Sequence, residues 1–399
     1  MAATADQVHE MQGLYGPFTI AERVVQKIWL RQDFAAHDAR LLDGRKLVIR
    51  RPGTWNLLAG PDFRGARLAI AGCEVTGDVE VHFHAGDWRA HGHDADPAYD
   101  GVVLHVVMFP PSDTPAIART REPLPTLVLL PLLHRGLEEY ASDDALENLT
   151  ARDTAEKLAE LSVLPPAELR ERLLQRARGR WDQKVRYAAL RIKRLGWTGA
   201  AHHTALEILG YRHNRAAMLA VAARHPLAEW GGGLDVEAAY REQEAAWQTQ
   251  GVRPANHPRR RLHQYAAWVA HAPDWPERLD ALLAGLAPLP DPFLGLQARR
   301  QLGLAHLRER LLTEVTGGAV AGSRLDNLTC DGLLPLLAAR TGRDLWPCWF
   351  HWFLGDNPRE VSRGLLPLGL AGPEAGPRCH GWAQGLLAWI IERDARASG

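Results

Sequence analysis

The chain has 399 residues, of which 46% are hydrophobic and 24% charged, and this balance excludes wholesale disorder. Its 47 Lys+Arg equal its 47 Asp+Glu, so net charge gives no sign of a nucleic-acid or membrane partner. At about 100 to 200 residues per domain, we expect two or three domains.

The compartment follows from what the sequence lacks. Four cysteines are too few and too widely spread for a disulfide scaffold, which favours a reducing compartment. The first residues include Asp6 and Glu10 and do not resemble a signal peptide. No run approaches the about 20 apolar residues needed to span a bilayer. We expect a cytoplasmic protein with no membrane partner, and the sequence indicates no particular protein partner.

The first part of the chain alternates between helical and β-type patterns. Apolar residues at helical spacing predict an amphipathic helix over Thr19–Phe34, capped by Thr19. After the turn dipeptide Asp43-Gly44 come five segments with strand character. These are Leu47–Arg51, Ala66–Ala71, Asp78–His84, Val102–Met108 and Thr126–Leu130.

From about Asp153 the pattern changes to helix formers with a period near 3.6 residues. We therefore predict an α+β protein: an N-terminal mixed β-sheet with flanking helices over 1–150, followed by an all-helical region over 151–399. Glycine- and proline-rich stretches offer a further division of the helical region near 285–320. The Trp residues at 346, 349 and 352 have helical spacing and are predicted to be core, with Cys348 and His351 among them.

Five of the 18 histidines fall within 24 residues, between His82 and His105. Because side chains alternate along a strand, Asp78, Glu80, His82 and His84 are predicted to share one face. Exposed strand faces are usually built from Lys, Thr, Arg or Ser, so two acids and two histidines favour a functional face.

Asp62 follows a proline, and Glu80 precedes His82 by two positions one strand later. This pattern resembles the PD-(D/E)xK nuclease signature, in which the two acids hold a divalent cation. The resemblance implies a nuclease core in which Asp62, Glu80 and His82 hold the metal and Glu22 is an outer or additional ligand. Such an ion would neutralise the scissile phosphate and activate water.

His82 stands where that family has a lysine. A neutral imidazole can accept a proton or join the metal site, which favours Mn²⁺ or a similar ion. The cofactor expected is a divalent metal, Mg²⁺ or Mn²⁺, with Zn²⁺ as an alternative.

Other histidines near this strand are accessory candidates. His84 is a possible accessory on the face of the strand itself. His91, His93 and Asp96 could join the metal or hold a phosphate from a loop beside it, or could instead cap and fix that loop. His105, among apolar neighbours, is either a further ligand or a hydrogen-bonded core histidine. The runs at His82 and His91 do not fit the cupin or metallo-β-lactamase spacings.

Longer motifs occur in both parts of the chain. They are Gly60-Pro61-Asp62-Phe63, Gly77-x-Val79-Glu80-Val81-His82, Asp87-Trp88-x2-His91-x-His93, Arg180-Trp181-x2-Lys184, Leu209-Gly210-Tyr211 and Arg253-Pro254-Ala255-Asn256-His257-Pro258. Together they resemble an uncharacterised bacterial family, domain of unknown function 2851. The resemblance extends over nearly the whole chain and implies an identity without an activity.

Charge is unevenly placed along the chain. Residues 1–150 hold 14 Lys+Arg against 21 Asp+Glu, whereas residues 168–215 hold 12 against 4. The basic helical positions predicted to bind nucleic acid are Arg176, Arg178, Arg180 and Lys184, and a second group is Arg253, Asn256, Arg260 and Arg261. The alternatives are a solvated helix face paired with its own acids, and a loop anchored to neighbouring carbonyls.

The main hypothesis is a metal-dependent nuclease, or nucleic-acid-processing protein, that hydrolyses phosphodiester bonds, in DNA rather than RNA. The first alternative is a non-catalytic nucleic-acid-binding or assembly module with a decayed nuclease site. The second is a metallohydrolase that uses the histidine cluster on a small substrate.

Overall fold

The computed structural model describes residues 22–56, 59–111, 116, 123–134, 137, 140–141, 144, 151–211, 214–249, 252, 254–284 and 297–397. The predicted cap Thr19 and the predicted phosphate contact Arg253 lie outside these residues. The chain divides into two compact units, residues 1–144 with 395–399 and residues 145–394.

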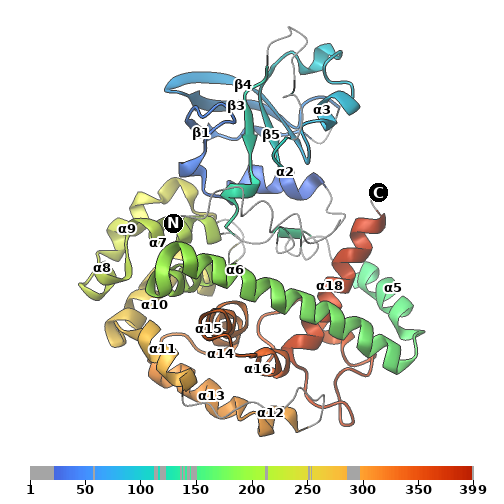
Figure 1. The fold of residues 1–399 in the computed structure, drawn as a ribbon, viewed down its shortest axis with the longest axis vertical. Helices are drawn as coiled ribbons and strands as arrows, with labels where there is room; N and C mark the ends of the chain where they lie inside the picture. The colour runs from blue at the N-terminus through green and yellow to red at the C-terminus, as the bar shows by residue number, and fades with distance from the viewer. Residues whose placement is uncertain are drawn as a thin grey trace. The chain divides into compact units, whose positions relative to one another are not determined.

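The first unit is built on a mixed sheet (Figure 1). Its strands run in the order β1-β3-β4-β5-β6, with β2 beside β3. β4 and β5 are parallel, as are β5 and β6, and the other pairs are antiparallel. The strands are β1 (Leu47–Arg51), β2 (Thr54–Trp55), β3 (Phe63–Ile70), β4 (Cys73–His82), β5 (Val102–Val107) and β6 (Thr126–Val128). The predicted mixed sheet is confirmed.

β3 and β4 are longer than the sequence pattern indicated, because they form a hairpin. Ala71 and Gly72 make the two-residue turn, and both have positive φ angles, 50° and 87°. Such a turn matches the twist of the flanking strands and fixes their register. Phe63 consequently pairs with Val79, so Asp62 lies opposite Glu80.

Helix α2 (Glu22–Arg31) packs against β4 and buries Val24, Val25, Ile28 and Trp29, the apolar face predicted from the sequence. Short helical segments precede, separate and follow the strands of this unit. They are η1 (Ala36–Asp38), α3 (Asp87–Ala90), η2 (Pro97–Tyr99) and η3 (Leu130–Leu132).

The last four residues of β4 are buried on both faces of the sheet. Val79 and Val81 point into the apolar core, while Glu80 and His82 on the other face are only 5% and 1% exposed. Trp88 and His105 lie in ring contact on that polar face, and His82 stacks with His93. The face predicted to be functional is therefore enclosed within the first unit.

The second unit is helical, as predicted, and begins with α5 (Ala151–Ser162) and α6 (Pro166–Leu209). The remaining α-helices are α7 (Arg215–Arg224), α8 (Leu227–Gly231), α9 (Val236–Glu242), α10 (Pro258–His271), α11 (Trp275–Ala284), α12 (Ala298–Gln301), α13 (Leu304–Arg310), α14 (Gly322–Leu328), α15 (Leu334–Thr341), α16 (Trp346–His351), α17 (Arg359–Gly364) and α18 (His380–Ala397). Shorter turns are η4 (Glu244–Ala246), η5 (Pro254–Asn256) and the π-helical η6 (Leu311–Val315) and η7 (Thr329–Leu333).

Helix α6 is the central element of this unit and contacts α7, α11, α14, α15 and α16 (Figure 1). Its 44 residues bend at Gly196, where φ is 70° and ψ is 176°. One apolar core extends from Leu161 to Ile390 and includes the buried Trp349 and Trp352, as expected. No described helix is long and apolar enough to cross a membrane.

Candidate metal centre

Asp62 and Glu80 are held side by side by main-chain hydrogen bonds between β3 and β4. The Asp62 N–H donates to Glu80 Oε2 at 2.9 Å, and the Val81 N–H donates to Asp62 Oδ2 at 3.1 Å. Gln26 of α2 donates to Asp62 Oδ1 at 2.7 Å. The two carboxyl groups therefore have fixed positions.

The second oxygen of Glu80 faces two histidines. Glu80 Oε1 lies 3.4 Å from His82 Nε2 and 3.3 Å from His93 Nε2. His82 ends β4, whereas His93 follows α3 and stacks on Tyr99 with ring centroids 3.8 Å apart. One carboxylate thus connects the acidic pair to the histidine cluster.

Three histidines are arranged as metal ligands would be. His82, His91 and His93 each offer a nitrogen, and these atoms all lie within 4.8 Å of one another. Burial and the nearby imidazoles, His105 first, lower the pKa of His82 to about 2, and burial lowers the pKa of His93. Both rings are therefore neutral at physiological pH, which is the form that binds a metal ion.

His105 lies behind this cluster. It is fully buried on β5, and its Nε2 is 2.9 Å from Nδ1 of His82. Its own Nδ1 has no hydrogen-bond partner among the described residues. When His82 carries its proton on Nδ1, this N–H donates a hydrogen bond to Nε2 of His105. The unprotonated Nε2 of His82 then faces Glu80 and His91. The sequence left two roles open for His105, a further metal ligand or a hydrogen-bonded core histidine. Its burial and its contact with His82 agree with the second role.

The carboxyl groups in this region resist ionisation. Burial, followed by the charge of Asp62, raises the pKa of Glu80 to about 8. Burial raises the pKa of Asp62 to about 6, and the bonds from Val81 and Gln26 oppose the shift. Burial, then Asp62 and Asp87, raises the pKa of Glu22 to about 7. A cation beside these groups would favour their charged forms.

Two accessory residues lie apart from the cluster. The prediction that His84 continues the polar face of the strand is wrong, because β4 ends at His82. His84 is exposed and stacks on Phe109, and its N–H donates to Asp87. Asp96 caps η2 by accepting a bond from the Ala98 N–H at 2.9 Å, which is the structural alternative considered for this loop.

Sequence reasoning missed Gln26, the α2 residue that holds Asp62. A signal for it exists, because Gln26 follows Glu22 by four positions and so lies on the same helix face. Trp88 is the other support, with its ring 5.3 Å from His93 and 5.4 Å from His105. Gln26 therefore holds Asp62 by a hydrogen bond, and the buried Trp88 ring packs against His93 and His105.

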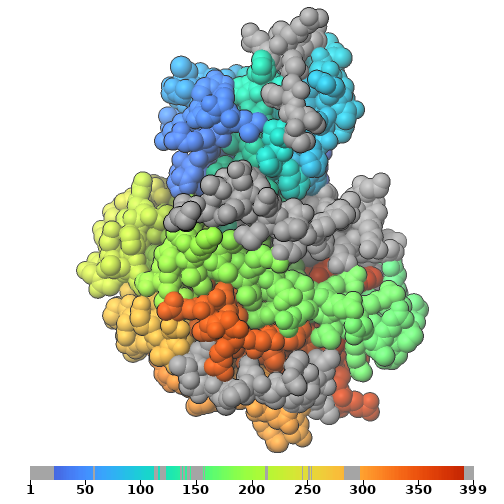
Figure 2. All heavy atoms as spheres, in the orientation of Figure 1, coloured from blue at the N-terminus to red at the C-terminus, as the bar shows by residue number. Residues whose placement is uncertain are grey.

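The basic positions on α6 are engaged within the helical unit. Lys184 is buried and forms an ion pair with Asp331 at 3.2 Å, and Arg180 donates to Gln384 at 2.8 Å. Arg178 pairs with Asp182 on the same helix, and Arg176 donates to a main-chain carbonyl of that helix. Figure 2 shows atoms of α6 on one face of the unit. Each of these four side chains therefore has a partner within the helical unit.

The described residues of the second basic group differ in exposure, and Asn256 is half-buried. Arg260 is exposed on α10, whereas Arg261 is buried and donates to Asn256 Oδ1 at 2.6 Å.

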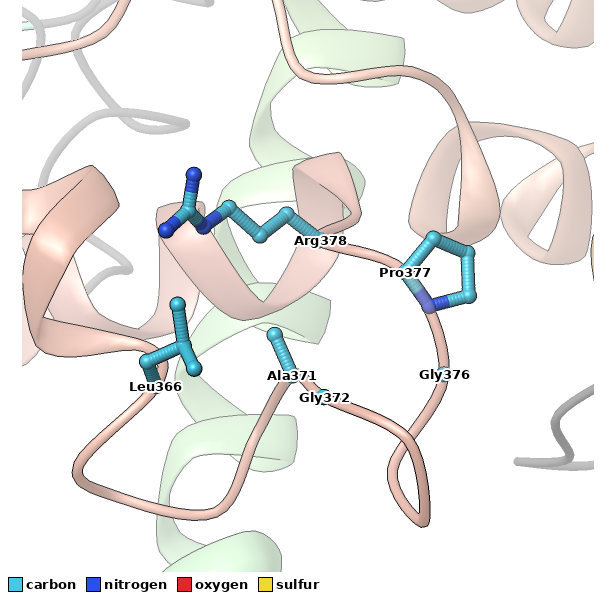
Figure 3. Close-up of a pocket in the computed structure, with 6 residues that line it drawn as sticks. All are labelled: Leu366, Ala371, Gly372, Gly376, Pro377 and Arg378. Carbon is cyan, nitrogen blue, oxygen red and sulfur yellow. The ribbon is translucent and has the colours of Figure 1, made fainter.

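A different part of this unit carries a shallow depression (Figure 3). Its lining offers neither a nucleophile nor a metal ligand, and consists of Leu366, Ala371, Gly372, Gly376, Pro377 and Arg378.

The family described as "Protein of unknown function (DUF2851)" matches residues 22–231. The chain belongs to this family. The DUF2851 match includes Glu22, Asp62, Glu80 and the histidine cluster, and it ends before Asn256 and Arg261, so it is shorter than the resemblance seen in the motifs. No curated protein and no solved structure matches the chain.

Proposed function

We propose that the first unit is a metal-dependent hydrolase that cleaves phosphodiester bonds in nucleic acid, with DNA favoured over RNA. The observation that carries the proposal is the Glu80 carboxylate, which contacts the Asp62 main chain on one side and two imidazole nitrogens on the other. Carboxylate and imidazole ligands around one point suit Mn²⁺ or Mg²⁺, and Zn²⁺ where the imidazoles dominate.

The cation would be held by Asp62, Glu80 and His82, where it would neutralise charge on the scissile phosphate and lower the pKa of an attacking water. The residues around it supply the remaining chemistry. The imidazole nitrogens of His91 and His93 can accept a proton from water, and Gln26 keeps Asp62 oriented. Glu22 at the start of α2 can serve as an outer ligand.

The order of elements supports a phosphodiester substrate. Helix α2 with Glu22, β3 preceded by Asp62, β4 with Glu80 and β5 with His105 follow the order of the PD-(D/E)xK core. His82 lies two positions after Glu80, where that core has lysine. The preference for DNA is inferred from this resemblance.

A second candidate function is hydrolysis of a small substrate at a histidine-bound metal. The convergence of His82, His91 and His93 within 4.8 Å favours it, because three imidazoles with an open position are a common zinc arrangement. In that case Asp62 would position Glu80 instead of binding the ion.

Cleavage assays on the full chain test the proposal. Supercoiled, linear duplex and single-stranded DNA and RNA are incubated with Mg²⁺, Mn²⁺ or EDTA. We expect metal-dependent cleavage that falls by about two orders of magnitude in Asp62→Asn and Glu80→Gln. Asp78→Asn is the matched control, because Asp78 lies on the same strand and accepts a bond from the Gly65 N–H.

Each other outcome of the assays overturns the proposal in a distinct way. Salt-sensitive binding without cleavage would identify a non-catalytic nucleic-acid-binding module. Zinc-dependent hydrolysis of bis(p-nitrophenyl) phosphate alone, lost in His91→Ala but kept in Asp62→Asn, would identify the small-substrate enzyme. Equal activity in Glu80→Gln and the wild type would exclude the site altogether.

A further inference from the structure

Two arginines of the helical unit converge on one neutral oxygen. Arg261 of α10 and Arg324 of α14 are 8% and 7% exposed. Their guanidinium groups donate to the same Asn256 Oδ1, at 2.6 Å and 3.3 Å respectively. Buried arginines are normally paired with a carboxylate, because an uncompensated buried charge is costly.

The side chains around Arg261 and Arg324 offer mainly neutral oxygens to the two guanidinium groups. The other partner of Arg261 is the neutral Oε1 of Gln264 at 2.6 Å. Arg324 forms an ion pair with Asp356 at 3.2 Å, and its guanidinium lies over the ring of Tyr211. The side chain of Asp356 is 41% exposed, so its charge is weakened by solvent. Nε of Arg261 and Nε of Arg324 have no partner among the described residues.

The same place is the start of a helix. Asn256 and His257 immediately precede α10, which has 14 residues, and His257 makes no side-chain capping bond. The main-chain N–H groups of a helix start attract anions. The first residue of α10, Pro258, has no N–H, so the charged donors here are the two guanidinium groups, which come from different helices. Guanidinium groups bind the oxygens of phosphates as well as those of carboxylates.

We propose that Asn256, Arg261 and Arg324 form a binding site for a phosphate group at the start of α10. The ligand is an inorganic phosphate or the phosphate of a nucleotide or nucleic-acid strand, and its oxygens accept from the two guanidinium groups. This site is separate from the cation centre of the first unit and does not depend on the proposed hydrolase activity.

Calorimetric titration of the full chain with inorganic phosphate, at ionic strength held constant with NaCl, tests the site. We expect saturable binding that weakens at least tenfold in Arg261→Gln and in Arg324→Gln. Arg259→Gln is the matched control, because Arg259 is on the same helix but pairs with Glu237 on its exposed side. Circular dichroism establishes that each variant is folded. No saturable binding by the wild type, or equal loss in the control, would overturn the proposal.

Asn256→Asp gives a second test that does not depend on removing an arginine. It places a carboxylate where both guanidinium groups already point, so we expect a higher melting temperature and loss of phosphate binding. Unchanged phosphate binding in this variant would contradict the site. Oligonucleotides with and without a 5′-phosphate distinguish the possible sources of the bound phosphate group. Competition with inorganic phosphate by the phosphorylated strand alone would indicate a terminal phosphate. Competition by both strands would indicate the diester backbone.

Discussion

At the scale of single residues, Glu80 and His105 define how the candidate centre is organised. Glu80 uses one carboxylate oxygen to accept from the Asp62 N–H and presents the other to His82 and His93. His105 contacts His82 from behind, at 2.9 Å. A histidine that ligates a metal usually makes a hydrogen bond through its other nitrogen, which fixes the tautomer and ring orientation.

The role of His105 as a positioning residue is testable. We expect His105→Leu to weaken Mn²⁺ binding by about 10- to 100-fold, because the outer bond to His82 is lost. His105→Gln, whose amide oxygen can accept from His82, should restore most of the affinity. Titration calorimetry measures the affinities, and nitrogen-15 NMR reports the His82 tautomer. Equal Mn²⁺ affinity in His105→Leu and His105→Gln would show that His105 has a purely structural role. The control is His84→Asn, because His84 is exposed and lies outside the cluster.

At the scale of elements, the centre depends on how closely β5 approaches β4. A Cβ at Gly77 would lie 2.3 Å from Val103 Cγ1 and 2.8 Å from the Gly101 carbonyl oxygen. Gly77 therefore allows β5 to begin beside β4 in the register that pairs Glu80 with His105. Without that register, His105 could not reach His82.

We expect Gly77→Ala to destabilise the first unit by about 1–3 kcal/mol, because main-chain atoms must move to admit the methyl group. Gly86→Ala is the control, since a Cβ there meets nothing within 4 Å. Chemical denaturation followed by circular dichroism measures the difference. A free energy of unfolding equal in both variants would show that β4 and β5 have room to separate.

At the scale of the whole molecule, the two units carry different titratable groups. The candidate ligands all belong to the first unit, whereas His202 and His380 are buried in the helical one. Burial lowers the pKa of His202 to about 4 and that of His380 to about 3. His202 lies 2.7 Å from the Tyr265 hydroxyl through Nδ1 and 3.0 Å from the His225 carbonyl through Nε2, so its neutral ring can use both nitrogens.

Metal binding should therefore stabilise only one unit. We expect Mn²⁺ to slow amide hydrogen exchange in peptides that contain Val79–Val81 and Leu104–Val106, and EDTA to reverse the effect. Peptides from α10 and α15 should exchange at the same rate with and without metal. Protection confined to the helical unit, or absent altogether, would place the metal elsewhere or exclude it.

Acid should weaken the helical unit. The folded form keeps His202 neutral, whereas the unfolded chain binds a proton below its usual pKa of 6.5. Stability is therefore lost as pH falls from about 6.5 towards 4, by about 2 kcal/mol for this residue at pH 4.5. Urea unfolding monitored by Trp fluorescence should show a shallower pH dependence in His202→Gln. Tyr265→Phe, which keeps the buried imidazole, should retain the wild-type dependence; a retained slope in His202→Gln would contradict this assignment.

The sequence by itself determined the fold class and most of the candidate site. Period-two and period-3.6 patterns predicted the mixed sheet and the helical region, because burial of one face governs both. The same alternation correctly placed Glu80 and His82 on one face of β4. The hairpin at Ala71 and Gly72 was not predicted, since its turn has no strong glycine or asparagine pair.

Only the tertiary structure decided which polar residues meet. It ended β4 before His84, brought His93 from a loop to Glu80 and His91 to His82, and placed Gln26 against Asp62. It also turned Lys184 inward and joined Arg324 to Arg261 across 63 positions of sequence. Local patterns report which face of an element is apolar, but contacts between polar side chains depend on the packing of distant elements, which no local period encodes.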